Sequence, residues 1–138
     1  VSNTICRVDC TVVPQDVTAV GVLVGHSEIT EQNMPAALIV KDKTDTEDAE
    51  YIEPLADLQA KYKRVTFNAV GEGMINVCNE GGNIQAGDYI CTSSVKGKGM
   101  KQSDGVYRNY TVARARESAA WDSSSNVFKQ IACIYLAG

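Results

Sequence analysis

The sequence lacks several features that would assign it a function at once. It has a single histidine, His26, and no serine within a nucleophile-elbow motif, so a Ser–His–Asp hydrolase is not expected. No apolar run is long enough to span a bilayer as a helix, and membrane insertion is therefore not expected. The formal net charge of −4 disfavours nucleic acid as a partner, because nucleic-acid affinity comes largely from clustered Lys and Arg.

Cysteine is present, but not in a pattern that builds a metal or redox motif. The five cysteines are an odd number without a CxxC pair, which argues against a zinc knuckle or a thioredoxin-type motif. All except Cys10 adjoin an Ile or Val, the setting of a thiol that serves as a small buried hydrophobe. We expect that role, with a disulfide or a metal site as alternatives, for the following residues: Cys6, Cys78, Cys91 and Cys133.

Size and composition fit one ordinary globular domain. The chain has 138 residues, of which 44% are hydrophobic and 22% charged, and a core of this size needs no covalent staple. We therefore expect one compact domain over residues 1–138. Because the numbering begins at Val1 and not at Met, we also expect a fragment of a longer chain, with no secretory leader in the part given.

The first half of the chain predicts strands and one charged loop. Alternating apolar residues predict a half-buried strand over Cys6–Val12. The apolar run Val17–Val24 predicts a strand buried on both faces, with Gly21 at a bulge or a close approach. A short strand is expected at Ala36–Val40, followed by a solvated acidic loop over residues 41–50 whose spacing does not fit an EF-hand.

One helix and a series of further strands are expected next. Pro54 and the helical spacing of Leu55, Leu58 and Tyr62 predict a short helix near residues 54–63. Alternation then resumes from Arg64 to Cys78, with a bulge or bend at residues 71–73. Turn-rich segments separate three more predicted strands, at Asp88–Thr92, Tyr107–Arg116 and Val127–Leu136. The fold class is therefore mainly β, a single compact domain of antiparallel or mixed sheets or a barrel, with one short helix.

Two groups of residues are candidates for a reactive or phosphate-binding site. Ser93 and Ser94 lie near Lys96, Lys98 and Lys101, and a serine with a desolvated lysine base can cleave peptides. The surrounding Gly-rich, polar sequence favours a solvated turn instead. The two glycines around Lys98 lack a Walker pattern and a following helix, so a phosphate loop is not predicted. We predict no catalytic, cofactor-binding or metal-binding residue, and no cofactor.

Arginines and a tryptophan in the last third suggest contacts with other molecules. Arg108, Arg114 and Arg116 are expected on an exposed strand face, from which they could meet a polyanion or a glycan. Trp121 lies in a Ser-rich loop and is expected to be exposed. We favour a subunit contact for Trp121, with stacking on a sugar as the alternative.

Three segments stand out in the second half of the chain: GEGMINVCNEGGNIQAGDYICTSSVKGKGMKQ at Gly71–Gln102, NYTVARARES at Asn109–Ser118, and IACIYLAG at Ile131–Gly138. They resemble the terminal domains of fibre and appendage proteins from tailed phages and large algal or marine DNA viruses. The segment VGVLVG at Val20–Gly25 looks like the start of the same module. The resemblance covers most of the chain from Val20 onward, with the acidic loop and the helix less typical.

The resemblance implies a structural role in a virion. It implies a domain that forms a homotrimer, registers the chains of a fibre shaft, contacts other virion proteins and meets a host cell-surface glycan, assembled in the host cytoplasm. Certain relatives act as intramolecular chaperones and cut themselves off once, so a self-cleaving endopeptidase is an alternative, for which Ser2 and Asn3 are compatible with a cleaved junction. A carbohydrate-binding module, suggested by Trp121 and the tyrosines, is a further alternative.

Overall fold

The fold is mainly β, as the sequence predicts. A computed structural model describes residues 8–30, 32, 39–41, 50–52, 55–122 and 128–137. Strands dominate these residues, and a single short helix, α1 (Leu55–Lys61), lies where the helical spacing places it. Among the described residues, no helix is long and apolar enough to cross a membrane.

The chain divides into two compact units, which are described separately. Unit 1 comprises Val1–Val8 and Gly25–Thr66, and unit 2 comprises Asp9–Val24 and Phe67–Gly138. The strands are as follows: β1 (Val22–Ser27), β2 (Ile39–Lys41), β3 (Glu50–Ile52), β4 (Arg64–Asn68), β5 (Val70–Cys78), β6 (Tyr89–Thr92), β7 (Gly99–Lys101), β8 (Thr111–Ala115) and β9 (Phe128–Leu136).

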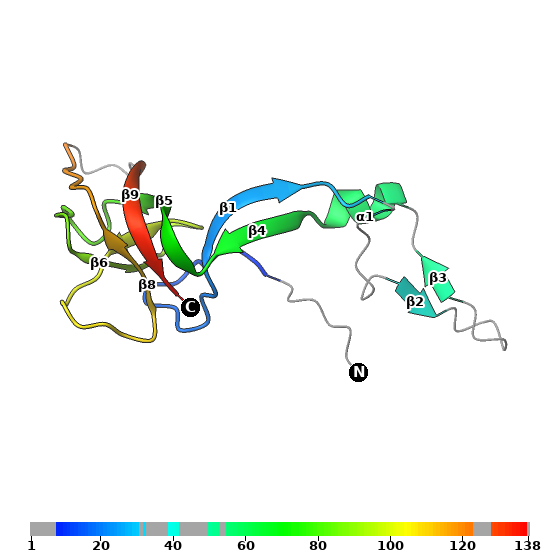
Figure 1. Cartoon of the computed structure of the whole chain (residues 1–138), viewed down its shortest axis with the longest axis horizontal. Coiled ribbons are helices and arrows are strands. Elements are labelled where there is room, and N and C mark those ends of the chain that lie inside the picture. Colours follow the sequence, from blue (N-terminus) through cyan, green and yellow to red (C-terminus); the bar gives the residue numbers. More distant parts are fainter. Residues whose placement is uncertain are drawn as a thin grey trace. The chain divides into compact units, whose positions relative to one another are not determined.

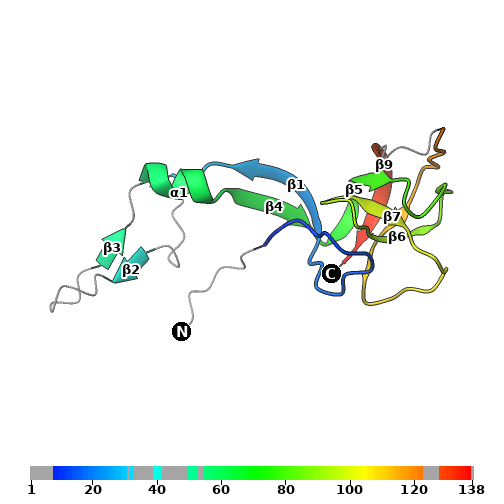
Figure 2. The same ribbon diagram turned by 180° about the vertical axis from the view of Figure 1, so that it is seen from behind.

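Unit 2 contains a closed five-stranded barrel in the order β5-β7-β6-β8-β9 (Figure 1). The first and last of these strands pair antiparallel over nine positions, from Val70 opposite Leu136 to Cys78 opposite Phe128. The short strand β7 lies between β5 and β6 (Figure 2), and its contact with β5 is parallel. The barrel closes between β5 and β7 through one paired position, Val77 opposite Gly99.

The barrel core follows from alternation along its strands. In β5, Ile75 and Val77 are buried while Met74 is exposed, and in β9 the buried residues are Ile131, Cys133 and Tyr135. Side chains at every second position of a strand share one face, so both strands turn an apolar face inward. The core cluster consists of Ile75, Val77, Ile84, Ile90, Val112, Ala113, Ala115, Ala119, Ile131, Cys133 and Tyr135.

Unit 1 holds a two-stranded sheet and the helix. β2 and β3 pair antiparallel, with Lys41 opposite Glu50, so the acidic segment of the sequence joins two paired strands. Residues 42–49, where the solvated loop is predicted, lie outside the described residues. Leu58 of α1 is buried, and the Gln59 side chain donates a hydrogen bond to the Ile29 carbonyl at 2.9 Å.

The structure corrects two strand predictions in the N-terminal part. Residues 8–12 form no strand, although apolar and polar residues alternate there, and Cys6 lies outside the described residues. Within Val17–Val24 only the last three residues belong to a strand, β1, and Leu23 and Val24 are exposed. Gly21 does mark a close approach, because a Cβ there would lie 2.7 Å from the Phe67 ring.

The expected irregularity at residues 71–73 lies elsewhere. β5 pairs with β9 through these residues without a shift in register, and the chain bends two residues before Gly71, at Ala69. Gly71 has a φ of +107°, which favours glycine. Gly73 leaves room for the Tyr135 ring, which would collide with a Cβ at this position.

Candidate functional site

A polar pocket opens on the barrel where the chain between β7 and β8 meets β6. Its volume is about 360 Å³, which lies within the range of small-molecule sites. Eight of its nine lining residues are glycine or carry a polar or charged side chain, and the ninth is a tyrosine. They are Gly87, Asp88, Tyr89, Lys101, Gln102, Ser103, Asp104, Gly105 and Arg114.

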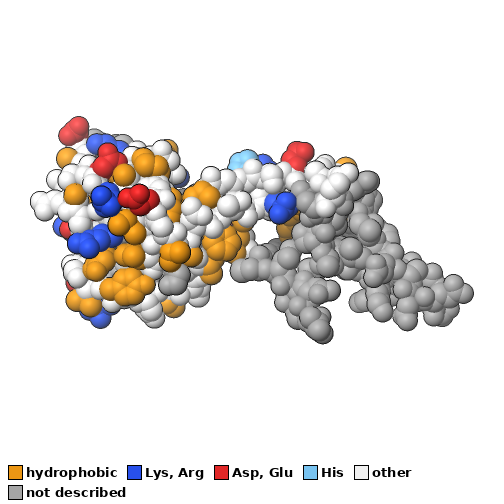
Figure 3. Space-filling view, viewed as in Figure 1, with side chains coloured by type: hydrophobic (Ala, Val, Ile, Leu, Met, Phe, Trp, Pro, Cys, Tyr) orange, Lys and Arg blue, Asp and Glu red, His pale blue; other side chains and the backbone are white. Residues whose placement is uncertain are grey.

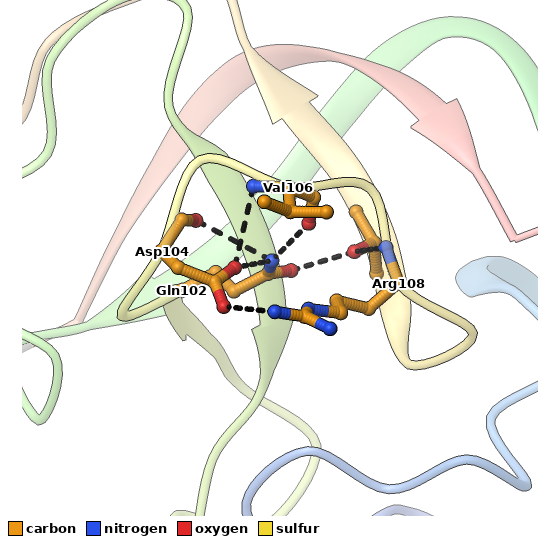
Figure 4. A network of polar contacts seen from close by, with 5 residues as sticks. Gln102, Asp104, Val106 and Arg108 are labelled. Carbon is orange, nitrogen blue, oxygen red and sulfur yellow. Dashed lines mark hydrogen bonds and ion pairs between the residues drawn. The ribbon is translucent and has the colours of Figure 1, made fainter.

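Gln102 organises one wall of this pocket through a buried side-chain amide (Figure 4). Its Nε2 donates to the Val106 carbonyl at 2.7 Å and to Asp104 Oδ1 at 2.8 Å. Its Oε1 accepts a hydrogen bond of 2.6 Å from the Thr111 hydroxyl. Both polar atoms of the amide thus have partners within the protein, and the loop from Asp104 to Val106 is fixed to the barrel.

The charges around the pocket pair off with one exception. Asp104 Oδ2 lies 2.9 Å from Arg108 Nη2, and hydrogen bonds from Gln102 and then Arg108 lower the pKa of Asp104. Asp88 Oδ2 lies 3.6 Å from Lys101 Nζ and accepts the Gln85 backbone N–H at 2.8 Å. Arg114 uses only its Nε, which donates to the Gly87 carbonyl at 3.2 Å. No acidic side chain of the described residues forms an ion pair with Arg114.

A second feature is an irregular segment, residues 9–21, which we call the arm. Its backbone is fixed to the barrel: the Gln15 N–H donates to the Thr92 carbonyl at 3.2 Å, and Thr11 accepts from the Gly97 N–H at 2.9 Å. The Thr92 hydroxyl donates to the Val13 carbonyl at 2.8 Å and accepts from the Asp16 N–H at 2.7 Å. Four backbone groups of the arm, all between Thr11 and Asp16, thus bond the barrel without joining a sheet.

The arm nevertheless turns apolar side chains to solvent. Four of its valines, which we call the arm valines, are 42 to 57% exposed: Val12, Val13, Val17 and Val20. Unit 2 also exposes Leu23, Val24, Phe67 and Val70. Figure 3 shows hydrophobic side chains in several separate patches on the described part of one face. Exposed apolar side chains gathered on one segment mark an interaction surface more often than scattered ones do.

Ser93 and Ser94, the candidate nucleophiles, both form hydrogen bonds that hold their own loop. Ser93 is fully buried, and its hydroxyl donates to the Lys98 carbonyl at 2.7 Å. The Ser94 hydroxyl and N–H donate to the two carboxylate oxygens of Glu80, each at 2.7 Å. Lys98 Nζ lies over the Phe128 ring, 4.6 Å from its centroid. This loop thus pairs neither serine with a desolvated lysine, in agreement with the predicted turn.

The other residues singled out by the sequence lie on different surfaces. His26 is exposed on β1. Arg108, Arg114 and Arg116 are all exposed, as predicted, but only Arg114 lies on a strand, since Arg108 precedes β8 and Arg116 follows its last residue. Arg116 forms an ion pair of 3.3 Å with Glu72. Only Arg108 and Arg114 lie at the pocket or its supporting network.

Trp121 is partly buried rather than freely exposed. It packs against the barrel core, and its indole N–H donates to the Gly82 carbonyl at 2.9 Å. Lys129 Nζ lies 5.4 Å from the ring centroid. The Trp121 ring therefore packs against the barrel. The prediction of an exposed ring at this position is wrong. Ser2 and Asn3, the basis of the self-cleavage alternative, lie outside the described residues.

Three of the four cysteines expected to be buried are confirmed in that role, and Cys6 lies outside the described residues. Cys78, Cys91 and Cys133 are at most 1% exposed, and burial raises the pKa of Cys91 and of Cys133 to about 11. Cys10 is exposed on the arm. Within the described ranges, no three His, Cys, Asp or Glu side chains are grouped to hold a metal ion.

Comparison with known proteins adds no relative: no family model, curated protein or solved structure matches this chain. The class is therefore defined by fold and surface alone. Unit 2 is a closed β barrel that carries an exposed apolar arm and a polar pocket.

Proposed function

We propose that this chain is an assembly domain that associates with copies of itself through the arm valines. More particularly, we propose that it is the terminal domain of a trimeric virion fibre, spike or appendage, where it registers the chains of the shaft and contacts the host surface. The observation that carries the assembly role is the exposure of the arm valines on a backbone that is already fixed. The resemblance of Gly71–Gln102 and Ile131–Gly138 to viral fibre domains supports the particular role.

The physical argument starts from the cost of exposing the arm valines. Each leaves roughly half of its side chain in water, and covering apolar surface is worth about 25 cal/mol per Å². The arm cannot turn its valines inward without breaking its bonds to Thr92 and Gly97. A partner that covers the arm therefore gains this energy without reordering it, which favours tight association.

A second copy is the partner that this role requires. Most soluble oligomers are symmetric assemblies of one chain. In a fibre, three tethered chains are at high effective concentration, and a compact terminal module that associates first brings the shaft into register.

The test is the mass of the purified chain in solution, by sedimentation equilibrium or light scattering. We expect a trimer of the 14.9 kDa chain. Replacing Val12, Val13 and Val17 together by Ser should shift the protein to monomer while its circular dichroism stays unchanged. Val106→Ser is the matched control, because it removes a valine that is 53% exposed outside the arm, and it should leave the trimer intact. A wild-type chain that stays monomeric at micromolar concentration would contradict the proposal.

A further inference from the structure

We propose that the polar pocket binds a sugar that carries a single carboxylate, a uronic acid residue of an acidic glycan, and that Arg114 binds the carboxylate. The inference rests on the host-contact part of the proposed function and names the ligand for it. It depends on the charges, the chemistry of the lining and the rigidity of the pocket wall.

The charges identify the ligand as a monoanion. Lys101 offsets Asp88, and Arg108 offsets Asp104, so the two carboxylates already have cationic partners. Arg114 bonds only a neutral carbonyl, through Nε, which leaves the terminal nitrogens of its guanidinium without a hydrogen-bond partner among the described residues. A guanidinium binds a carboxylate with two parallel hydrogen bonds. Two carboxylates beside one spare cation disfavour a doubly charged phosphate ester.

The lining indicates a polyhydroxylated ligand. Ser103 presents a hydroxyl, Lys101 an ammonium and the exposed Gly105 its backbone groups, which suit sugar hydroxyls better than an apolar molecule. Tyr89 supplies the one aromatic wall, and the Tyr107 ring holds it edge to face at 6.2 Å between centroids. Arg114 lies directly opposite Tyr89 in the pairing of β6 with β8. The cation and the ring therefore stand side by side on the barrel.

The pocket wall is already ordered. The loop that carries Asp104 and Val106 is held by the buried Gln102 amide (Figure 4). A ligand therefore does not have to order this wall when it binds, which favours affinity from a small number of contacts.

The experiment compares sugars that differ only at C6. Glucuronate and galacturonate are titrated into the full chain against glucose and galactose, and binding is followed by chemical shifts of backbone amides around Tyr89 and Arg114. We expect saturable binding of the uronates in the millimolar range and none of the neutral sugars. Acetate and inorganic phosphate are titrated as separate arms and should not saturate the site. Equal binding by either simple anion would overturn the proposal, because it would show an anion site without sugar recognition.

Two charge variants complete the test. Arg114→Gln should weaken uronate binding about tenfold or more, while Arg116→Gln, which removes the same charge from an exposed arginine outside the pocket, should leave it unchanged. Equal losses in both variants would reduce the effect to net charge and overturn the proposal, as would the absence of uronate binding by the wild type. Association is measured separately by sedimentation. A monomer that binds uronates would therefore contradict only the assembly role, and a trimer that does not bind them only this inference.

Discussion

Gln102 connects the pocket to the barrel core. A glutamine is usually found at the surface, yet this one is 1% exposed and bonds Asp104, Val106 and Thr111 at once. The network also determines the electrostatics of the loop, since the same amide helps lower the pKa of Asp104. Its loss would affect both stability and the shape of the pocket.

Replacing Gln102 by Leu should destabilise the protein by about 2 to 4 kcal/mol, because the buried Thr111 hydroxyl and the Val106 carbonyl lose their partner. Urea denaturation followed by circular dichroism measures this change. Gln85→Leu, at an exposed position, serves as control and should stay within about 0.5 kcal/mol. Equal stability of the two variants would show that the amide network contributes nothing.

At the level of single residues, the sequence predicts roles that follow from neighbours in the chain. Cys78, Cys91 and Cys133 lie among Ile and Val, and the structure buries them. The burial of Gln102 depends on Thr111, nine residues away, and the position of Trp121 on Gly82, thirty-nine away. Contacts of this kind leave no periodic signal in the sequence. The sequence therefore predicts neither the pocket nor the packing of Trp121 against the barrel core.

Among the elements, the pairing of β5 with β9 is the longest in the barrel. Its register places Gly73 opposite Cys133, and the Tyr135 ring fills the space that a side chain at position 73 would need. The Tyr135 hydroxyl donates to the Met74 carbonyl. The ring therefore lies across β5 and cannot move away without losing this bond.

Gly73→Ala should therefore destabilise the barrel by about 2 kcal/mol through overpacking. The melting temperature and the urea midpoint report this change. Gly105→Ala is the matched control, because nothing lies within 4 Å of its added Cβ, and it should be close to neutral. A Gly73→Ala protein as stable as this control would mean that the Tyr135 ring moves aside freely.

Segments whose backbone hydrogen bonds are those of a regular helix or strand are the ones that the sequence predicts correctly. The helix near residues 54–63 and the final strand, predicted at Val127–Leu136, are confirmed within a residue or two, because their patterns match regular hydrogen bonding. Residues 8–12 show the same alternation as a strand, but the Thr11 carbonyl accepts its bond from Gly97 in a loop and not from a neighbouring strand. Apolar periodicity alone does not distinguish a strand of the barrel from an arm lying outside it.

For the whole molecule, the mainly β fold class is confirmed, because it follows from composition, alternation and turn residues summed over many segments. The strand order with its parallel β5–β7 contact was not predicted. Which strands pair depends on tertiary contacts between distant segments, and the pattern of residues along the chain does not specify these contacts.

Stability should fall at alkaline pH because of two buried thiols. Burial raises the pKa of Cys91 and Cys133 from 9.0 to about 11. Between these values the unfolded chain releases protons that the folded barrel retains, so the free energy of unfolding decreases as pH rises. Below pH 9 the contribution is fully present.

We expect a loss on the order of 1 kcal/mol per thiol between about pH 8 and about pH 10, measured by urea denaturation at each pH. The double variant Cys91→Ala, Cys133→Ala should show a smaller slope with pH, whatever its absolute stability. Cys10→Ala, at the exposed cysteine, should keep the wild-type slope. An unchanged slope in the double variant would assign the pH dependence to other groups.

The pairing of the first barrel strand with the last one also bears on how the chain folds during synthesis. While β9 is still inside the ribosome, β5 and β8 each wait with an open edge, since β9 is the strand that joins them. Closure therefore brings together Val70 and Leu136 late, and such distant contacts slow folding. Until β9 pairs with them, these edges of β5 and β8 stay open, and an open strand edge can pair with another chain.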